Sequence, residues 1–554
     1  MLLFPDYLGK VRVAVKSVLP QITDNDIIVD ESGFSDIVIR TFAASKKTGA
    51  DFAAIASQVQ PLISKLEFVD RIEARNGYIN VFLKSSVLIV PVLESLERTG
   101  TYPDNFQDPE RVCVEHTSTN PTGPIHIGRA RNSIIGDSVA RILSRYGYRV
   151  TTQYYVNDAG KQVIALHEGF RRYFEGKDRN VSNLLAGYQK IYQEMESLGG
   201  ESKILGPVIK RYERNDEELI ESVKSAAAIV LKSIKESLER VGIRIDDFVW
   251  ESGFLHGTDL DHVFEGLEEH LKDENGAKYL DLPNGRKLFL QRSDGTSLYP
   301  ARDLAYHLFK ALNADWLIDV LGEDHKDHGT AIRYVLMTLL DFKQRLDFIF
   351  YGFVSLDSGK LSTRKGNIIT LDELVERTTA ETHSIVAEKR KDLEPERLKT
   401  IAEAVAVSSI RFSIAKVNAD KHMIFRWSEA LNFEGDSAPF IMYAYSRATT
   451  LFKDYGTGSW PAGEVDLVQH ERKLARTVFL YPYYLTDAAK SLRPDVICSY
   501  LLSLVKAYND FYSTCRIKGE NQEVQARRLS LNRAFRSVIF DAASLVGIRL
   551  LEEM

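Results

Sequence analysis

The stretch RVCVEHTSTNPTGPIHIGRARN, residues 111–132, is the most informative part of the chain about its fold. Arg111–Glu115 predicts a short apolar strand, and a loop rich in glycine and proline follows at Asn120–Pro124. From about Gly128 to Arg145, apolar side chains recur at helical spacing, and Tyr148–Val156 predicts a second strand. The order strand, glycine loop, helix, strand is a βαβ unit. It implies a parallel sheet of the Rossmann type at the centre of an α/β protein.

Outside this unit the pattern of charged and apolar residues changes along the chain. Residues 165–275 are highly charged and have helical patterning, which predicts a helical insertion in the α/β domain. Three later stretches predict that the sheet resumes: Leu288–Leu290, Trp316–Leu321 and Phe348–Val354. From about Thr378 to the end nearly everything has helical period, and Ser437 is the expected cap of a helix that starts at Ala438-Pro439.

The first 100 residues predict a small α+β unit. Residues 51–66 have apolar side chains at helical spacing. Two strand-like stretches then flank Asn76-Gly77, a pair that suits a tight hairpin because both residues tolerate positive φ. With Thr99–Glu110 as a linker, three domains are expected: residues 1–105, an α/β domain of residues 106–375, and an all-α bundle of residues 376–554.

Composition limits the function. The chain has 554 residues, of which 44% are hydrophobic and 27% charged, as in soluble globular proteins. Its 71 basic and 77 acidic residues give a net charge of −6, which excludes a polybasic nucleic-acid binder but permits a local basic face. No apolar run is long enough to span a membrane, and no signal peptide is expected. Three cysteines without C-x-x-C spacing predict neither zinc nor disulfides, so a cytoplasmic location is expected.

Two loops carry residues suited to phosphate. His126-Ile127-Gly128-Arg129 lies at a helix start, whose free N–H groups and positive dipole end favour anions. Gly128 leaves room for a nucleotide, and His126 can donate a hydrogen bond. The second loop, residues 359–367, holds Lys360, Arg364 and Lys365 between glycines. Alone, the first motif is a weak signal and the second is more simply a solvated basic turn.

Together the two loops resemble the HIGH and KMSK signatures of the class I aminoacyl-tRNA synthetases, in the same order and about 230 residues apart. The resemblance narrows to the arginyl-tRNA synthetases of an archaeal-like type. It extends over essentially the whole chain and is carried by residues 115–132, Tyr155–Gly160, Tyr299–Asp303, Glu434–Ala444 and Leu545–Ile548.

The resemblance implies two sets of site residues. The arginine-binding set is Glu115, Asn120, Tyr299, Asp303 and His325. The catalytic and ATP-binding set is His126, Gly128, Arg129, Asp324, Lys360, Ser362 and Lys365. Acidic and amide acceptors suit a guanidinium, which has five donors and no acceptor. The spacing of four puts Tyr299 and Asp303 on one helix face. Packing of Tyr299, and a surface ion pair of Asp303 with Arg302 or Lys310, are the alternatives.

The chain departs from the family pattern at two positions. Arg129 stands for the second histidine of HIGH, and Thr363 for the second lysine of KMSK. Lys365 or Arg364 is then expected to supply the second charge, because Gly123 occupies the position where some relatives have a compensating lysine. Tyr443 and Met554 are expected at the anticodon end by resemblance, with packing inside the bundle as the alternative for Tyr443.

The implied activity is that of an arginine–tRNA ligase, which consumes ATP with Mg²⁺ and has no structural zinc. Arginine is activated to an adenylate and passed to the terminal adenosine of its tRNA. The N-terminal domain is expected to bind the tRNA core, and the protein is expected to be a monomer. Two alternatives stay open: another class I synthetase or nucleotidyltransferase, and an RNA-binding paralogue without activity.

Overall fold

The computed structural model describes residues 4–100, 110–198, 200, 202–357 and 369–554. The chain divides into two compact units. One joins residues 1–106 to residues 431–554, and the other spans residues 107–430. The three domain boundaries expected from the sequence stay a prediction. Among the described residues, no helix has the length and apolarity that crossing a bilayer requires.

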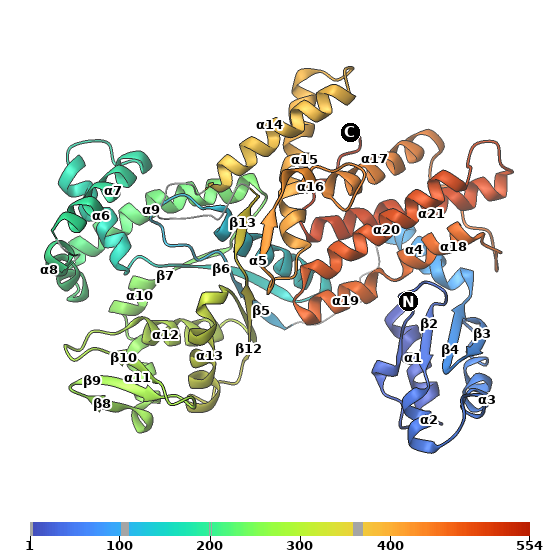
Figure 1. Ribbon diagram of the computed structural model, residues 1–554, viewed down its shortest axis with the longest axis horizontal. Helices are drawn as coiled ribbons and strands as arrows, with labels where there is room; N and C mark the ends of the chain where they lie inside the picture. The colour runs from blue at the N-terminus through green and yellow to red at the C-terminus, as the bar shows by residue number, and fades with distance from the viewer. Residues whose placement is uncertain (1–3, 101–109, 199, 201, 358–368) are drawn as a thin grey trace. The chain divides into compact units, whose positions relative to one another are not determined.

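A five-stranded parallel sheet forms the centre of the second unit (Figure 1). Its strand order is β12 (Arg345–Tyr351), β11 (Trp316–Gly322), β5 (Arg111–Glu115), β6 (Arg149–Val156) and β7 (Asp247–Trp250). Helix α5 (Ile127–Tyr146) connects β5 to β6, which confirms the predicted βαβ unit. In this register Glu115 lies beside Asp319 of β11, so two carboxylates meet at the carboxyl end of the central strand.

Two sheet predictions are wrong. Leu288–Leu290 belongs to β10 (Lys287–Gln291), which pairs with β9 (Ala277–Asp281) and β8 (Lys272–Glu274) in a separate antiparallel sheet. An apolar triplet alone does not show which sheet it joins. Conversely, β7 lies within the predicted insertion yet completes the parallel sheet. It has four residues, none of them fully buried, so it gives little apolar signal.

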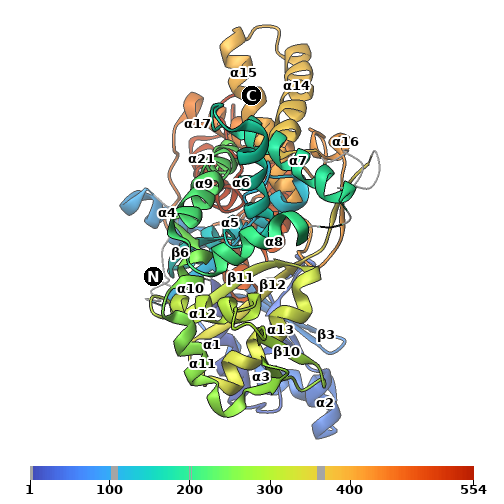
Figure 2. The same ribbon diagram turned by 90° about the vertical axis from the view of Figure 1, so that its left-hand side faces the viewer.

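Four helices make up most of the insertion: α6 (Lys161–Phe174), α7 (Val181–Ser197), α8 (Ser202–Glu213) and α9 (Glu217–Arg240) (Figures 1 and 2). Helices α6 and α7 touch through their backbones where Gly169 meets Gly187. A Cβ added at Gly187 would lie 2.7 Å from the Gly169 carbonyl carbon. Glycine is required at this crossing because the two backbones leave no room for a side chain.

Gly169→Ala is expected to destabilise the insertion by about 1–3 kcal/mol, because its Cβ would strike the Gly187 carbonyl. Gly206→Ala in α8 is the matched control, since no atom lies within 4 Å of the Cβ it adds. That variant should be neutral or more stable by up to about 1 kcal/mol. Thermal unfolding measures both. Equal melting temperatures for the two variants would contradict the tight crossing.

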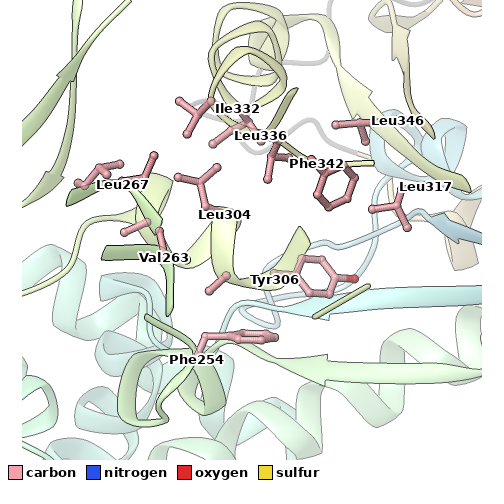
Figure 3. Packing of buried hydrophobic residues seen from close by; sticks show 14 of the residues in the cluster. Phe254, Val263, Leu267, Leu304, Tyr306, Leu317, Ile332, Leu336, Phe342 and Leu346 are labelled. Atoms are coloured by element: carbon pink, nitrogen blue, oxygen red, sulfur yellow. The ribbon is translucent and has the colours of Figure 1, made fainter. Parts of the chain in front are cut away.

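A hydrophobic core fixes α12 (Tyr299–Ala311) against the sheet. Leu304 and Tyr306 pack with Phe254 of α10 (Glu251–His256) and Val263 of α11 (Asp259–Gly266), as Figure 3 shows. Ile332 of α13 (Lys326–Tyr334) and Leu317 of β11 close the same cluster. Helix α12 is therefore held on several sides, and side chains on its sheet-facing surface have fixed positions.

The unit ends with a mostly helical segment. Its helices are α14 (Leu371–Lys389), α15 (Pro395–Ala415) and α16 (Trp427–Ala430). One exception to the helical prediction is β14 (Met423–Phe425), which pairs in parallel with β13 (Val354–Leu356). The buried Arg131 of α5 donates to the Gly352 and Asn418 carbonyls, so this segment is tied to the helix that begins directly after His126.

The other unit begins with the predicted α+β part. Its antiparallel sheet has the order β1 (Ile27–Val29), β2 (Ile37–Arg40), β4 (Tyr78–Leu83) and β3 (Val69–Arg75). Asn76 and Gly77 have φ of 51° and 81°, which confirms the hairpin turn. The helices are α1 (Phe4–Lys16), α2 (Phe42–Thr48), α3 (Phe52–Ile63) and α4 (Ser85–Thr99).

Five helices complete this unit: α17 (Ala438–Tyr455), α18 (Gln469–Phe479), α19 (Tyr481–Ser491), α20 (Pro494–Thr514) and α21 (Gln522–Leu545). Ser437 caps α17 as predicted, accepting from the Phe440 N–H. The two ends of the chain are joined by Asp36, whose buried carboxylate pairs with Arg472 at 2.6 Å and Arg476 at 3.2 Å. The N-terminal sheet and α18 are therefore parts of one body.

Candidate active site

His126 is the residue that precedes helix α5, and its ring lies over the first turn. A Cβ added at Gly128 would come within 3.1 Å of two atoms of this ring. Backbone bonds from Leu371 N to the Ile125 oxygen and from Ile127 N to the Ile369 oxygen hold the loop in place. The glycine thus lets the imidazole lie across the helix start, where N–H groups and the dipole favour an anion.

The His126 ring is neutral at pH 7. Burial, and secondarily the charge of Arg129, lower its pKa to about 4. Its Nδ1 is buried and has no hydrogen-bond partner in the described part of the chain. A neutral imidazole donates one hydrogen bond and accepts one. The loop therefore presents an imidazole with an unused nitrogen beside a helix start that favours anions.

Asp324 and His325 follow the end of β11 in a single helical turn, Glu323–His325. The Asp324 carboxylate folds back over Gly322, where any Cβ would collide with it. His325 is half-buried, and burial lowers its pKa. Both residues lie beyond the carboxyl end of a parallel strand, the position at which open α/β sheets bind ligands.

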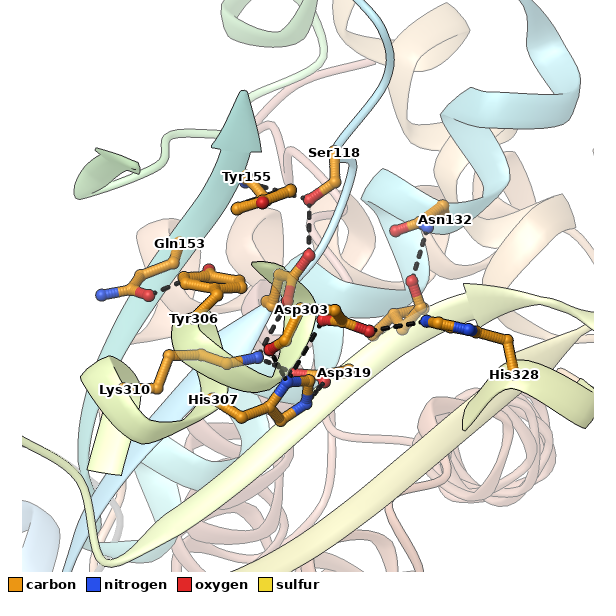
Figure 4. A network of polar contacts seen from close by, with 12 residues as sticks. Ser118, Asn132, Gln153, Tyr155, Asp303, Tyr306, His307, Lys310, Asp319 and His328 are labelled. Atoms are coloured by element: carbon orange, nitrogen blue, oxygen red, sulfur yellow. Dashed lines mark hydrogen bonds and ion pairs between the residues drawn. The ribbon is translucent and has the colours of Figure 1, made fainter. Parts of the chain in front are cut away.

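Tyr299 and Asp303 lie one turn apart on α12, as their spacing predicted. Asp303 Oδ2 accepts from His328 Nε2 at 2.7 Å (Figure 4). The His328 ring lies 5.1 Å from the Tyr299 ring. Tyr299 stays 37% exposed, so a small molecule can reach it. The expected alternative of an ion pair between Asp303 and Arg302 or Lys310 fails, because Arg302 pairs with Glu251 and Lys310 pairs with Glu115 and Asp319.

A second histidine approaches Asp303 from the sheet side. His307 Nδ1 lies 3.2 Å from Asp303 Oδ1, and its Nε2 lies 2.8 Å from Asp319 Oδ2. Burial alone would raise the pKa of Asp303. The charge and hydrogen bonds of His307, together with His328, outweigh burial and hold that pKa well below its usual range. Asp303 is therefore ionised at neutral pH and positioned from two sides.

Glu115 joins this group indirectly. Its Oε2 accepts from Lys310 Nζ at 2.9 Å, and its Oε1 accepts from Ser118 at 2.9 Å. Lys310 also bonds Asp319 Oδ1 at 2.6 Å, so a continuous network runs from Glu115 to Asp303. Asn120 is outside it, since its exposed amide donates to Gln162. The structure thus brings Glu115, Tyr299 and Asp303 together and leaves Asn120 apart.

The turn after Glu115 has a strained backbone. Thr117 and Ser118 have φ of 73° and 36°, values that residues with a side chain rarely adopt. Asn132 holds this turn by accepting from Thr117 N at 2.7 Å and donating to the Val320 oxygen at 2.7 Å. Strain of this kind persists where surrounding contacts fix it, and it is found often at functional sites. Here the strained turn positions the Ser118 hydroxyl to donate a hydrogen bond to Glu115.

Sequence reasoning missed six residues of this region: Ser118, Asn132, His307, Lys310, Asp319 and His328. Three of them carried a readable signal. His307 and Lys310 follow Asp303 by four and seven residues and so share its helix face. Asp319 stood out as one acid within an apolar strand. Nothing in the sequence distinguished His328 from His325.

The remaining predicted residues lie elsewhere. Lys360, Ser362 and Lys365 fall outside the described residues, so their roles stay predictions. Tyr443 of α17 is 48% exposed, which excludes the alternative of a tyrosine buried in the bundle. Met554 is half-buried at the chain end. In the described part of the chain, no group of three or more His, Cys, Asp or Glu side chains is arranged to hold a metal ion.

Family models match most of the chain. Residues 92–427 match the catalytic domain of class I tRNA synthetases (R), and residues 441–554 match the DALR anticodon binding domain. An arginine–tRNA ligase of Thermoplasma acidophilum is 47% identical over 100% of both chains. That of Archaeoglobus fulgidus is 37% identical over 90% of each chain.

A solved structure shares the fold over the full length. The arginyl-tRNA synthetase of Thermus thermophilus superposes with a TM-score of 0.84, covers 100% of both chains and is 24% identical. That of Plasmodium falciparum superposes with a TM-score of 0.82 over 99% of both chains at 19% identity. The predicted architecture of a parallel-sheet catalytic part with a C-terminal helical part is confirmed.

Proposed function

Because the chain belongs to the arginyl-tRNA synthetase family of class I, we propose that the network around Asp303 is where its arginine substrate binds. The protein is an enzyme that joins arginine to tRNA. That reaction requires separate places for the amino acid, the nucleotide and the tRNA, and a different group of residues is suited to each.

Asp303 is the proposed acceptor for the guanidinium. It is an ionised carboxylate on a fixed helix, next to an exposed tyrosine, at the carboxyl edge of the sheet. A guanidinium donates to such a carboxylate in a planar pair, and a lysine ammonium does not reproduce that geometry. Each acceptor left unpaired by lysine costs about 1–3 kcal/mol, which provides selectivity for arginine. Glu115 contributes through Lys310, while Asn120 and His325 are further acceptors proposed from resemblance.

The His126 loop is the proposed site for the ATP phosphates. Support comes from the helix start, the unpartnered Nδ1 and the ring position that Gly128 allows. Arg129 adds a permanent charge, and Asp324 is proposed to accept from ribose hydroxyls. Lys360, Ser362 and Lys365 are proposed to bind the pyrophosphate that leaves. ATP phosphates bring Mg²⁺, which needs few protein carboxylates because it keeps water and phosphate ligands.

Activation needs no nucleophile from the protein. The arginine carboxylate is already ionised and attacks the α-phosphorus of ATP, with pyrophosphate leaving in line. The site therefore accelerates the reaction by positioning the two substrates and by stabilising charge on the phosphates. A ribose hydroxyl of the terminal tRNA adenosine then attacks the adenylate carbonyl. Family resemblance suggests the 2′-hydroxyl and a need for bound tRNA in the first step.

The DALR-like part is proposed to bind the anticodon. Arg447 of α17 lies 4.8 Å from the ring of Tyr443 and 4.6 Å from the ring of Tyr512 on α20. The two tyrosines are 48% and 41% exposed, so part of each side chain is open to solvent. Unpaired bases stack on aromatic and guanidinium faces. This arrangement supports Tyr443 as an anticodon residue, with Met554 proposed by resemblance.

The N-terminal α+β part is proposed to bind the tRNA core. Phe42, Phe52 and Tyr78 form an exposed cluster, with the Phe42 ring 5.4 Å from Phe52 and 5.0 Å from Tyr78. Each of these rings is at least 40% exposed. Three aromatic rings left open to solvent are suited to bases that protrude from a folded RNA. A monomeric, cytoplasmic enzyme remains part of this proposal.

The single observation that carries the assignment of the site is the ionised Asp303 beside the exposed Tyr299. The decisive experiment is arginine-dependent charging of bulk tRNA, measured with and without prior incubation with tRNA. We expect arginine alone among the amino acids to support charging, and pyrophosphate exchange to need tRNA. Charging that depends on another amino acid would contradict the assignment. Exchange without charging would point to a nucleotidyltransferase.

A further inference from the structure

The donor and acceptor pattern around His307 fixes its protonation. Nδ1 faces the Asp303 carbonyl at 2.8 Å and Asp303 Oδ1 at 3.2 Å. Nε2 faces Asp319 Oδ2 at 2.8 Å, and the other oxygen of Asp319 accepts from Lys310 at 2.6 Å. These neighbours of the two ring nitrogens are all acceptors. A neutral imidazole has one nitrogen that cannot donate, so this ring carries two protons.

We propose that His307 is a positioning residue for arginine: a buried imidazolium that fixes the Asp303 carboxylate and keeps it ionised to receive the guanidinium. The inference rests on the proposed role of Asp303 in binding arginine. His307 does not itself touch the substrate, because it lies between Asp303 and Asp319 on the sheet side of α12 and is 2% exposed.

The surrounding charges support a permanent imidazolium. Burial and Lys310 oppose the charge, yet Asp303 and Asp319 outweigh them and raise the pKa of His307 to about 9. The titratable groups around it come from four elements: Asp303 and Lys310 on its own helix, Asp319 on β11, Glu115 on β5 and His328 on α13. The nonpolar Phe348 of β12 lies 6.4 Å from the ring, so His307 is shielded from water on that side.

Replacement by a neutral side chain should make arginine binding sensitive to pH. Asp303 is buried, and burial raises the pKa of a carboxyl, so its ionisation at pH 6 depends on cationic neighbours. With His307→Gln the pKa of Asp303 rises. A growing fraction of Asp303 is then protonated as the pH falls, and a protonated carboxyl binds a guanidinium poorly. In the wild type the same carboxyl stays ionised throughout this range.

The experiment measures the KM for arginine in tRNA charging between pH 6 and pH 8. We expect KM to rise about tenfold in His307→Gln at pH 8 and to rise further toward pH 6. The wild-type KM should stay flat, and the KM for ATP should not change. Tyr306→Phe is the matched control: it alters the adjacent buried residue and removes a bond to Gln153, but it should leave the pH profile flat. An equal rise in KM at every pH would show a packing role only and overturn the proposal.

Two further measurements distinguish a wrong assignment of the arginine site from a wrong role for His307. Asp303→Asn should raise the KM for arginine at all pH values. If it does not, the proposed arginine site is wrong, whereas a normal KM profile in His307→Gln alone overturns only the role of His307. Should His307→Gln not fold, ¹⁵N NMR of the 12 histidines in the wild type decides the matter. One ring that is still doubly protonated at pH 8 is expected, and the absence of any such ring refutes the imidazolium.

Discussion

Replacing Asp303 by alanine is expected to raise the KM for arginine at least about 100-fold, which corresponds to roughly 3 kcal/mol of binding. The carboxylate is ionised and fixed by His307 and His328 before the substrate arrives, so little is lost in organising it when arginine binds. Its removal leaves the guanidinium without its charged acceptor. The KM for ATP should change by less than about threefold, because the His126 loop is a separate set of residues.

Asp327→Ala is the matched control for this prediction. Asp327 is also a carboxylate near the sheet edge, but its side chain is 83% exposed and pairs with Arg286 on the surface. Its loss should leave both KM values unchanged. An unchanged arginine KM in Asp303→Ala would remove the basis for the arginine site. A parallel rise in the KM for ATP would instead indicate collapse of the whole sheet edge.

Lys310→Met is expected to destabilise the second unit, residues 107–430, by about 3–5 kcal/mol. Its apparent melting temperature should fall by about 10 °C. The ammonium has no exposed surface and bridges Asp319 and Glu115. Its removal leaves two buried carboxylates without their shared cation. The matched substitution Lys343→Met removes an exposed lysine that pairs with Asp341, and its cost should stay within about 0.5 kcal/mol.

The pH dependence of this loss has a definite sign. Burial raises the pKa of Asp319, but Lys310 and His307 outweigh burial and lower this pKa below its ordinary value. In the wild type, Asp319 therefore stabilises the fold fully at a pH above its ordinary pKa, and this stabilisation is lost as the pH falls toward the lowered pKa. Without Lys310 the same burial raises the folded pKa, and the folded state then binds protons more tightly than the unfolded chain. The deficit of Lys310→Met should therefore shrink between pH 8 and pH 5.5. A constant deficit would indicate lost packing instead of lost charge pairing.

The sequence predicted those parts of the fold that depend on local pattern. The βαβ unit, the Asn76-Gly77 hairpin and the Ser437 cap depend on neighbours within a few residues, and all three are confirmed. The predictions for Leu288–Leu290 and for the segment of β7 are wrong because contacts with distant strands decide which sheet a strand joins. Short apolar runs do not encode those contacts.

The same distinction applies to the site. Tyr299 and Asp303 were predicted because the short stretch Tyr299–Asp303 resembles that of the family, and its spacing of four places both residues on one helix face. The network behind them was not, because Glu115, Lys310 and Asp319 meet only when β5, α12 and β11 are assembled. His328 was missed since its bond to Asp303 spans 25 residues and depends on how α13 packs.

The ion pair of Asp36 with Arg472 has a consequence for biosynthesis. Its partners are separated by 436 residues, so the ribosome makes one long before the other. At the usual 5–20 residues per second, the interval is roughly 20–90 s. During that time the N-terminal sheet and helices have no α18 to pack on, and Phe4 and Tyr7 lack the Phe479 ring that lies 5.7 Å from each in the finished fold. The N-terminal sheet and helices are thus made early but complete their packing only after α18 has been made. Until then Phe4 and Tyr7 lack one of the rings that cover them in the folded protein.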